Sequence, residues 1–233
     1  MSYFDHFSIS QGTPIGRWIK YRSRAGAYRR IHSYIPDLDA KILEIGPGWG
    51  ELAMCFRAGG YKYCQLVEPN ARMREHLTAM GFVTSDYRVP IIREADQSYD
   101  AILLADVFEH LGGMAEAEAF VGEAFRVLRP GGILCILSPD YLHWKIDFFN
   151  CDYSHSNITT VRRVVQLLYN CDLRALTYFY YSGFVFGAPA TLVSWVMRLA
   201  FWYLRGNQLE SRWYKLKLTF LRQFLVIAQK SPT

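Results

Sequence analysis

Gly46, Gly48 and Gly50 stand at every second position after a short apolar run that contains Glu44. A turn without side chains lets a ligand lie against bare backbone where a strand leads into a helix. A dinucleotide loop, G-x-G-x-x-G, would place its third glycine where Glu51 stands, so the spacing excludes that class. A carboxylate at Glu44 would repel a pyrophosphate and attract an ammonium group. S-adenosylmethionine carries an ammonium group and no phosphate, and we expect it to be the cofactor.

Glu68 is a second candidate for cofactor binding. The run C-Q-L-V-E-P-N at 64–70 predicts a buried strand that ends at this acid. It stands about two dozen residues after Glu44, where a carboxylate can accept hydrogen bonds from both hydroxyls of a ribose. We therefore expect Glu68 to bind the ribose.

The elements that would position these residues alternate along the chain. Apolar residues from Pro14 to Ile35 predict one or two helices ahead of a first strand that begins near Lys41. Strands separated by helices imply right-handed crossovers and a parallel sheet covered on both faces. Thr159 or Thr160 would cap the last predicted helix. The pattern predicts helices at 50–58, 70–80, 113–128 and 158–169, and strands at 63–68, 82–84, 99–105, 132–138, 173–181 and 224–229.

Four motifs occur in a familiar order: E-I-G-P-G-W-G, L-V-E-P-N, the strand D-A-I-L-L with its Glu-His pair, and R-V-L-R-P-G-G. They resemble those of the class I S-adenosylmethionine-dependent methyltransferases. The resemblance implies an α/β, Rossmann-like sheet of seven strands in the order 3-2-1-4-5-7-6, with the last strand antiparallel and helices on both faces. We expect one methyltransferase domain over 1–233, with an N-terminal helical cap at 1–40, the core at 41–183, a helical lid or insertion at 184–222, and the last strand and tail at 223–233.

The resemblance also assigns roles to single residues. The three glycines of the turn would hold the methionine part of the cofactor. An acid after the third strand usually meets the adenine amine, and Asp86 in G-F-V-T-S-D-Y is the candidate here. Ala105 and Asp106, at the end of the fourth strand, are expected to contact the cofactor as well. The product would be S-adenosyl-L-homocysteine.

His110 is the candidate for catalysis. Methyl transfer from a sulfonium is an in-line displacement, so the protein mainly positions the acceptor and, for a hydroxyl, removes its proton. His110 follows the fourth strand in D-V-F-E-H-L, and its ordinary pKa suits proton removal near neutral pH. The alternative is that the Glu-His pair only caps or packs the next helix.

Two tetrads repeat one pattern after the fifth strand: D-Y-L-H, Asp140 to His143, and D-Y-S-H, Asp152 to His155. The carboxyl ends of parallel strands form the ligand crevice of such a sheet, so we expect these four side chains to line the acceptor pocket. They could also hold a divalent ion that acidifies a diol. No two of them share a helix turn, and the sequence favours a site without metal.

The loop before the last predicted helix bears on the class of acceptor. A His-then-Thr loop entering a helix near 158 looks like bacterial members of this superfamily that act on sugars, polysaccharide precursors or quinones. We therefore expect O-methylation of a small-molecule, glycan or lipid-linked acceptor. One alternative is a nucleic-acid methyltransferase, although A-D-V-F replaces the Asn/Asp-Pro-Pro-aromatic motif of base-amine enzymes. Another is a binding or scaffold protein that has lost transfer.

Both flanks of the chain are basic, with six Arg or Lys against one acid in 1–34 and again in 184–222. This excess of basic residues has two alternative explanations: helix faces exposed to solvent, or contact with an anionic partner. Residues 184–204 are apolar and near the length of a membrane span, but a last strand at 224–229 must return to the same sheet. Two interpretations of this segment remain: a helix that forms a lid over the acceptor pocket, or a helix that lies in the plane of a membrane surface. The N-terminus lacks signal-peptide order and the five cysteines form no C-x-x-C pair, so we expect a cytoplasmic protein, either free or membrane-associated.

Overall fold

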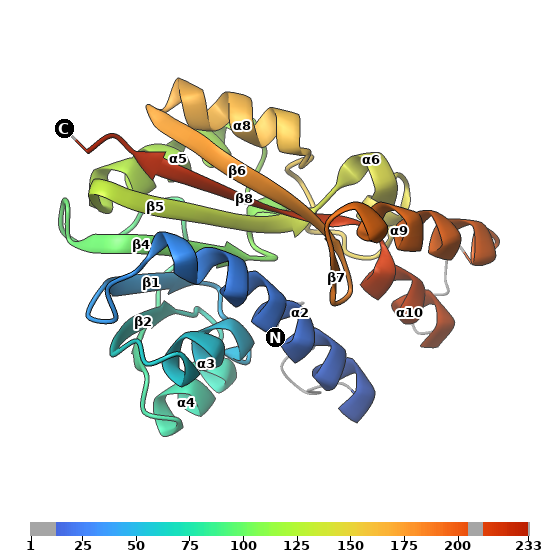
Figure 1. The fold of residues 1–233 in the computed structure, drawn as a ribbon, viewed down its shortest axis with the longest axis horizontal. Coiled ribbons are helices and arrows are strands. Elements are labelled where there is room, and N and C mark those ends of the chain that lie inside the picture. The colour runs from blue at the N-terminus through green and yellow to red at the C-terminus, as the bar shows by residue number, and fades with distance from the viewer. Residues whose placement is uncertain (1–12, 205–211, 233) are drawn as a thin grey trace.

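The computed structural model describes residues 13–204 and 212–232. Short apolar runs pair into a single sheet of eight strands in the order β3-β2-β1-β4-β5-β8-β6-β7 (Figure 1). The first five strands pair in parallel, whereas β8 is antiparallel to both β5 and β6. The strands are β1 (Lys41–Ile45), β2 (Tyr63–Val67), β3 (Val83–Ser85), β4 (Tyr99–Ala105), β5 (Leu128–Pro139), β6 (Leu173–Ser182), β7 (Val185–Phe186) and β8 (Gln223–Lys230).

Helices cover both faces of this sheet. One apolar layer joins the sheet to α5 and α8 through residues such as Phe120 and Leu168, and the other joins it to α2 and α3 through residues such as Ile31 and Phe56. The helices are α2 (Pro14–Ile31), η1 (His32–Tyr34), α3 (Glu51–Ala58), α4 (Ala71–Ala79), η2 (Phe108–His110), α5 (Met114–Val127), α6 (Tyr141–Trp144), α7 (Asp147–Asn150), α8 (Val161–Asn170), α9 (Ala188–Ala200) and α10 (Arg212–Phe220).

Local sequence explains where several helices begin. Thr13 accepts a hydrogen bond from the Gly16 N–H ahead of α2, and Asn70 does the same for the Met73 N–H of α4. Thr160 caps α8 by accepting from the Arg163 N–H, which confirms the cap predicted at 159 or 160.

The predicted Rossmann-like architecture is confirmed, with β8 in the place of the seventh strand and antiparallel as expected. The short strand β7, which forms a hairpin with β6, was not predicted. The fifth strand begins at Leu128 and not at 132, because Leu128 pairs with Tyr99 before the Pro-Gly-Gly segment loops out and pairing resumes between Ile133 and Ala101.

The described part of the segment 184–222 contains β7, α9 and α10, and its helices lie at one end of the sheet near α6 (Figure 1). Two buried ion pairs hold it there: Arg222 with Asp140, and Lys217 with Asp147. No helix within 13–204 or 212–232 is both long and apolar enough to cross a bilayer. Parts of the predicted cap (1–12) and insertion (205–211), and Thr233, lie outside the described residues.

Candidate functional site

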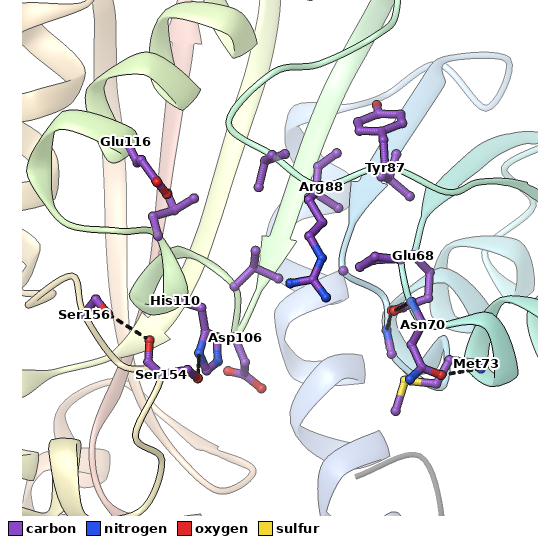
Figure 2. A pocket seen from close by; sticks show the side chains of 18 of the residues that line it. Glu68, Asn70, Met73, Tyr87, Arg88, Asp106, His110, Glu116, Ser154 and Ser156 are labelled. Atoms are coloured by element: carbon purple, nitrogen blue, oxygen red, sulfur yellow. Dashed lines mark hydrogen bonds between the residues drawn. The ribbon is translucent and has the colours of Figure 1, made fainter. Parts of the chain in front are cut away.

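A cavity of about 710 Å³ opens where β1, β2 and β4 end. Figure 2 shows Asp106, His110 and Ser154 on one side of it and Glu68, Asn70 and Met73 on the other, with Arg88 between them. Its lining comprises Ile45, Gly46, Gly48, Val67, Glu68, Pro69, Asn70, Met73, Tyr87, Arg88, Val89, Asp106, Val107, His110, Leu111, Glu116, Tyr153, Ser154 and Ser156.

The glycine turn leaves room for a ligand at one position. All three glycines have positive φ, a conformation that side chains other than glycine rarely adopt. A Cβ at Gly46 would lie 2.4 Å from Cγ2 of Val107, and one at Gly50 would lie 2.6 Å from Cδ2 of Leu77. A Cβ at Gly48 would meet no atom within 4 Å. Gly46 and Gly50 therefore allow close packing, whereas Gly48 exposes its backbone to the cavity.

Glu68 is fixed by the backbone around it. One carboxylate oxygen accepts from the Gly48 N–H at 3.1 Å and the other from the Asn70 N–H at 2.9 Å. Burial raises the pKa of Glu68 in spite of these two bonds. Each carboxylate oxygen has a further lone pair, so both can still accept from ligand hydroxyls.

Glu44 is a buried carboxyl group with an unsatisfied oxygen. Its residue is 1% exposed, and its Oε2 has no hydrogen-bond partner within the described parts of the chain. Burial raises its pKa to about 8, although the nearby guanidinium of Arg24 acts in the opposite direction. A carboxyl group of this kind stabilises a cation placed beside it.

Asp106 and Arg24 connect the sheet to the N-terminal helix. The chain turns sharply after β4, and Asp106 has a φ of 59°, which aspartate tolerates better than most residues. One of its carboxylate oxygens forms an ion pair with Arg24, which also donates to the Tyr181 hydroxyl at 3.3 Å. The other oxygen, Oδ1, is buried and has no partner within the described residues. Burial alone would lower the pKa of Arg24, but Asp106 and Tyr181 together raise it.

His110 lies at the opposite end of the cavity from Glu68. Its Nδ1 is 2.8 Å from the hydroxyl of Ser154, which donates to Oδ1 of Asp152 at 2.6 Å. The rings of His110 and His155 meet at a tilt, with centroids 4.8 Å apart. Burial and the neighbouring His155 both lower the pKa of His110.

A glycine turn, a fixed ribose-type acceptor and a polar far end thus share one cavity. The sequence model of a family described as "Methyltransferase domain" matches residues 16–176, which include all of these elements. The chain belongs to this methyltransferase family. No curated protein matches the sequence.

Solved structures show the same fold. An S-adenosylmethionine-dependent methyltransferase from Archaeoglobus fulgidus is 18% identical with a TM-score of 0.62, and the match covers 98% of this chain and 100% of that one. A second one, from Methanosarcina mazei, is 18% identical with a TM-score of 0.60, and the match covers 88% of this chain and 99% of that one. The cyclase SpnF is also similar, at 14% identity and a TM-score of 0.58, with 83% of this chain and 75% of that chain covered. The fold alone therefore does not fix the reaction.

S-adenosylmethionine is the cofactor expected for this methyltransferase. The residues in and beside the cavity fit that molecule. The unpaired oxygen of Glu44 suits the ammonium group, and the space over Gly48 suits a ligand against the backbone. Glu68 retains a free lone pair on each oxygen for the ribose hydroxyls. When bound, the cofactor supplies an activated methyl group on a sulfonium.

Several predicted cofactor residues lie outside the cavity lining. Glu44 is buried under the turn, and neither Gly50 nor Ala105 lines the cavity. Asp86 lines a separate surface hollow, and its side chain is 68% exposed. The cavity is lined instead by the next three residues, Tyr87 to Val89, at the place where the sequence predicted an adenine contact.

The first predicted acceptor tetrad supports the insertion and not the cavity. Asp140 is fully buried, and its Oδ2 accepts from Nε of Arg222 at 2.8 Å. Nδ1 of His143 lies 3.0 Å from the hydroxyl of Ser194 on α9. Burial, with Arg222 nearby, lowers the pKa of His143 to about 4. These contacts anchor α9 and the start of β8.

The second tetrad forms part of the cavity wall through its two middle residues, Tyr153 and Ser154. Neither Asp152 nor His155 lines the cavity, but Asp152 holds Ser154, and His155 packs against His110. Three residues that line the cavity or contact its lining were not identified from the sequence: Arg24, Asn70 and Ser154. Asn70 carries a recognisable helix-cap signal after L-V-E-P, whereas Arg24 and Ser154 act on partners far away in the chain.

Proposed function

We propose that this methyltransferase transfers the methyl group of S-adenosylmethionine to a hydroxyl oxygen of a small-molecule, glycan or lipid-linked acceptor. The observation that carries the proposal is the position of His110, which lines the same cavity as Gly48 and Glu68 and whose ring is fixed by Ser154. A polar group at the end away from the ribose site suits an acceptor hydroxyl.

In the proposed reaction the acceptor oxygen attacks the methyl carbon in line with the leaving sulfur. The carbon–sulfur bond breaks, its electron pair stays on sulfur, and S-adenosylhomocysteine forms. The hydroxyl must also lose its proton, and we assign His110 as the residue that promotes this loss. The cavity orients both reactants, which is the main requirement for a donor that is already activated.

A nucleic-acid acceptor has less support. Three cations that the sequence places in the basic flanks are Arg24, Lys217 and Arg222, and each pairs with a carboxylate of this chain. Cations engaged in this way do not contribute to phosphate binding, which depends on exposed Arg and Lys.

We also propose that the protein contacts a membrane surface through α9 and the residues around it. No described residue of 184–222 lines the cavity, which argues against a lid. One side of α9 and nearby residues, three of them after its end, instead expose a group of large apolar side chains, and amphipathic helices of this kind bind in the plane of a bilayer. The exposed group, the α9 apolar patch, comprises Leu192, Trp195, Val196, Leu199, Trp202, Tyr203 and Trp213. Free thiols at all five cysteines agree with a cytoplasmic location.

The test of the transfer reaction is a screen of acceptor classes with a labelled methyl donor, run beside His110→Ala. Label should enter an acceptor through an ether bond that survives mild base, and the variant should lose most of the turnover. Calorimetry with S-adenosylhomocysteine tests cofactor binding separately. Binding without transfer to any acceptor class would favour the scaffold alternative.

A further inference from the structure

Glu109, His110 and His155 form a cluster at the wall of the cavity. One potential ligand atom from each lies within 4.8 Å of those of the other two. Glu109 and His155 are buried, and His110 lines the cavity. The sequence favoured a site without metal, and its alternative set of four ligands shares only His155 with this cluster.

The hydrogen bonds of His110 decide which ring nitrogen carries the proton. The Ser154 hydroxyl has one proton, and it donates that proton to Asp152 at 2.6 Å. Ser154 Oγ can therefore only accept from Nδ1 of His110, 2.8 Å away. Nδ1 carries the proton, and Nε2 of the neutral ring has a lone pair.

His155 is held in the same tautomer by a different partner. Its Nδ1 lies 2.6 Å from the carbonyl oxygen of Phe148, which can only accept. Nδ1 thus donates, and Nε2 again keeps its lone pair. A histidine that donates from one nitrogen to a carbonyl or a carboxylate-linked group is the arrangement that orients metal-binding imidazoles.

Glu109 supplies a carboxylate that is also held in place. One oxygen, Oε2, accepts from the Ser138 hydroxyl at 2.9 Å. The backbone carbonyl of Glu109 accepts from the N–H groups of Ser156 and Asn157, both at 3.0 Å, which fixes the loop that carries His155. Each of the three side chains therefore has a hydrogen-bond partner that helps to hold it in place.

We propose that Glu109, His110 and His155 bind one divalent first-row transition metal ion. Two imidazole nitrogens and one carboxylate oxygen are ligands that such an ion accepts, and three protein ligands would leave further coordination positions for an acceptor. His110 lines the cavity, as does Asp106, whose buried Oδ1 has no hydrogen-bond partner within the described residues. The ligand class is a cation, because the cluster offers lone pairs and a carboxylate and no cation of the protein pairs with Glu109 in the described residues.

The metal would act on the acceptor, and this step rests on the proposed function. An acceptor hydroxyl bound to the ion loses its proton to solvent more readily, because the ion stabilises the alkoxide. The alkoxide oxygen then attacks the methyl carbon as the carbon–sulfur bond breaks. His110 thus promotes loss of the proton as a ligand of the ion.

The test measures metal binding without activity. Full-length protein, stripped with a chelator and dialysed, is titrated with Co²⁺ and with Mn²⁺ by calorimetry, and Co²⁺ is also followed by its visible absorption. We expect one ion per chain. His155→Ala and Glu109→Gln should each weaken binding at least tenfold, and Ser154→Ala should weaken it by roughly 10- to 100-fold through loss of the partner of His110. His32→Ala, at an exposed histidine outside the cluster, should have no effect.

Circular dichroism and S-adenosylhomocysteine binding separate the outcomes. If the variants keep the circular dichroism spectrum of wild type and its affinity for S-adenosylhomocysteine but lose the metal, the cluster is the metal site. If wild type binds no ion, or if His155→Ala and Ser154→Ala bind it as tightly as wild type does, the metal proposal is wrong. Failure of wild type to bind S-adenosylhomocysteine would instead contradict the proposed function and leave the metal result standing.

Discussion

Arg24 and Asp106 form an ion pair although they are 82 residues apart in the sequence. Arg24 lies in α2 and Asp106 follows β4, so the pair fastens the N-terminal helix to the strand end that lines the cavity. Because Arg24 is buried and Asp106 is partly exposed, removal of the arginine leaves a carboxylate that water can only partly solvate.

Arg24→Gln is expected to lower the free energy of unfolding by about 1 to 3 kcal/mol, reduced from the value for a fully buried pair because of the exposure of Asp106. Urea denaturation at pH 7 measures this. Arg72→Gln, at an exposed position of α4, is the control and should change little. A loss no larger than that of the control would show that the pair does not stabilise the fold.

Glu68→Gln should weaken S-adenosylhomocysteine binding by about 10- to 100-fold. The amide replaces one acceptor oxygen with a donor, which then faces a backbone N–H of Gly48 or Asn70 and can no longer accept from the ribose. Calorimetry gives the affinity. Asp86→Asn is the matched control, because Asp86 lies outside the cavity lining, and equal losses in the two variants would contradict the assignment of the ribose site.

Alanine at Gly48 and at Gly46 should give different defects. Both substitutions carry the cost of positive φ, about 1 to 2 kcal/mol. Gly48→Ala adds a methyl group to open space and should weaken S-adenosylhomocysteine binding at least tenfold with little further loss of stability. The methyl group added in Gly46→Ala would collide with Val107, so this variant should lower the melting temperature more than Gly48→Ala does. Unchanged affinity in Gly48→Ala would place the ligand elsewhere.

Glu44 should make stability depend on pH. Its pKa is raised from 4.5 to about 8 by burial, so between these values the folded chain holds a proton that the unfolded chain has lost. The free energy of unfolding therefore falls as pH rises through this range. Glu44→Gln cannot ionise, and its stability relative to wild type should rise by at least about 1 kcal/mol from pH 5 to pH 8.

Thermal unfolding at pH 5, 6.5 and 8 measures this difference, with the exposed Glu75→Gln on α4 as the control. The same Glu44 variant should bind S-adenosylhomocysteine more weakly, because glutamine cannot ionise when the ammonium group of the ligand is placed beside it. A stability difference that stays constant with pH would rule out ionisation of Glu44 as its cause.

The α9 apolar patch should bind anionic vesicles. The double variant Trp195→Ser/Leu199→Ser removes two side chains that are 60% and 76% exposed, and at least half of the vesicle-bound protein should move to the supernatant on sedimentation. Val83→Ser/Tyr169→Ser changes two exposed apolar residues elsewhere and should behave as wild type. Wild-type protein that stays in the supernatant at low salt would contradict the membrane proposal.

Features that depend on neighbouring residues were predictable from the sequence. The spacing of Gly46, Gly48 and Gly50 predicts a turn because each needs positive φ within five residues, and the structure has all three there. Thr160 caps α8 through a bond to a residue three positions away. The strand order followed from a resemblance of motifs, and the sheet agrees with it.

Features that depend on distant contacts were not predictable. The tetrads around Asp140 and Asp152 have nearly the same letters, yet Asp140 pairs with Arg222 and Asp152 holds Ser154. Their roles differ because one lies against β8 and the other against the loop at His110, which local pattern does not encode. The pairing of Arg24 with Asp106 likewise depends on where α2 packs.

The position of β8 has a consequence for synthesis of the chain. This strand, Gln223–Lys230, is translated after all the other strands, yet it lies between β5 and β6 and hydrogen-bonds to both. Until it leaves the ribosome, β6 and β7 have no neighbour through which to join the parallel half of the sheet. The nascent polypeptide must therefore wait with two open strand edges, and this interval is when chaperones or aggregation can act on it.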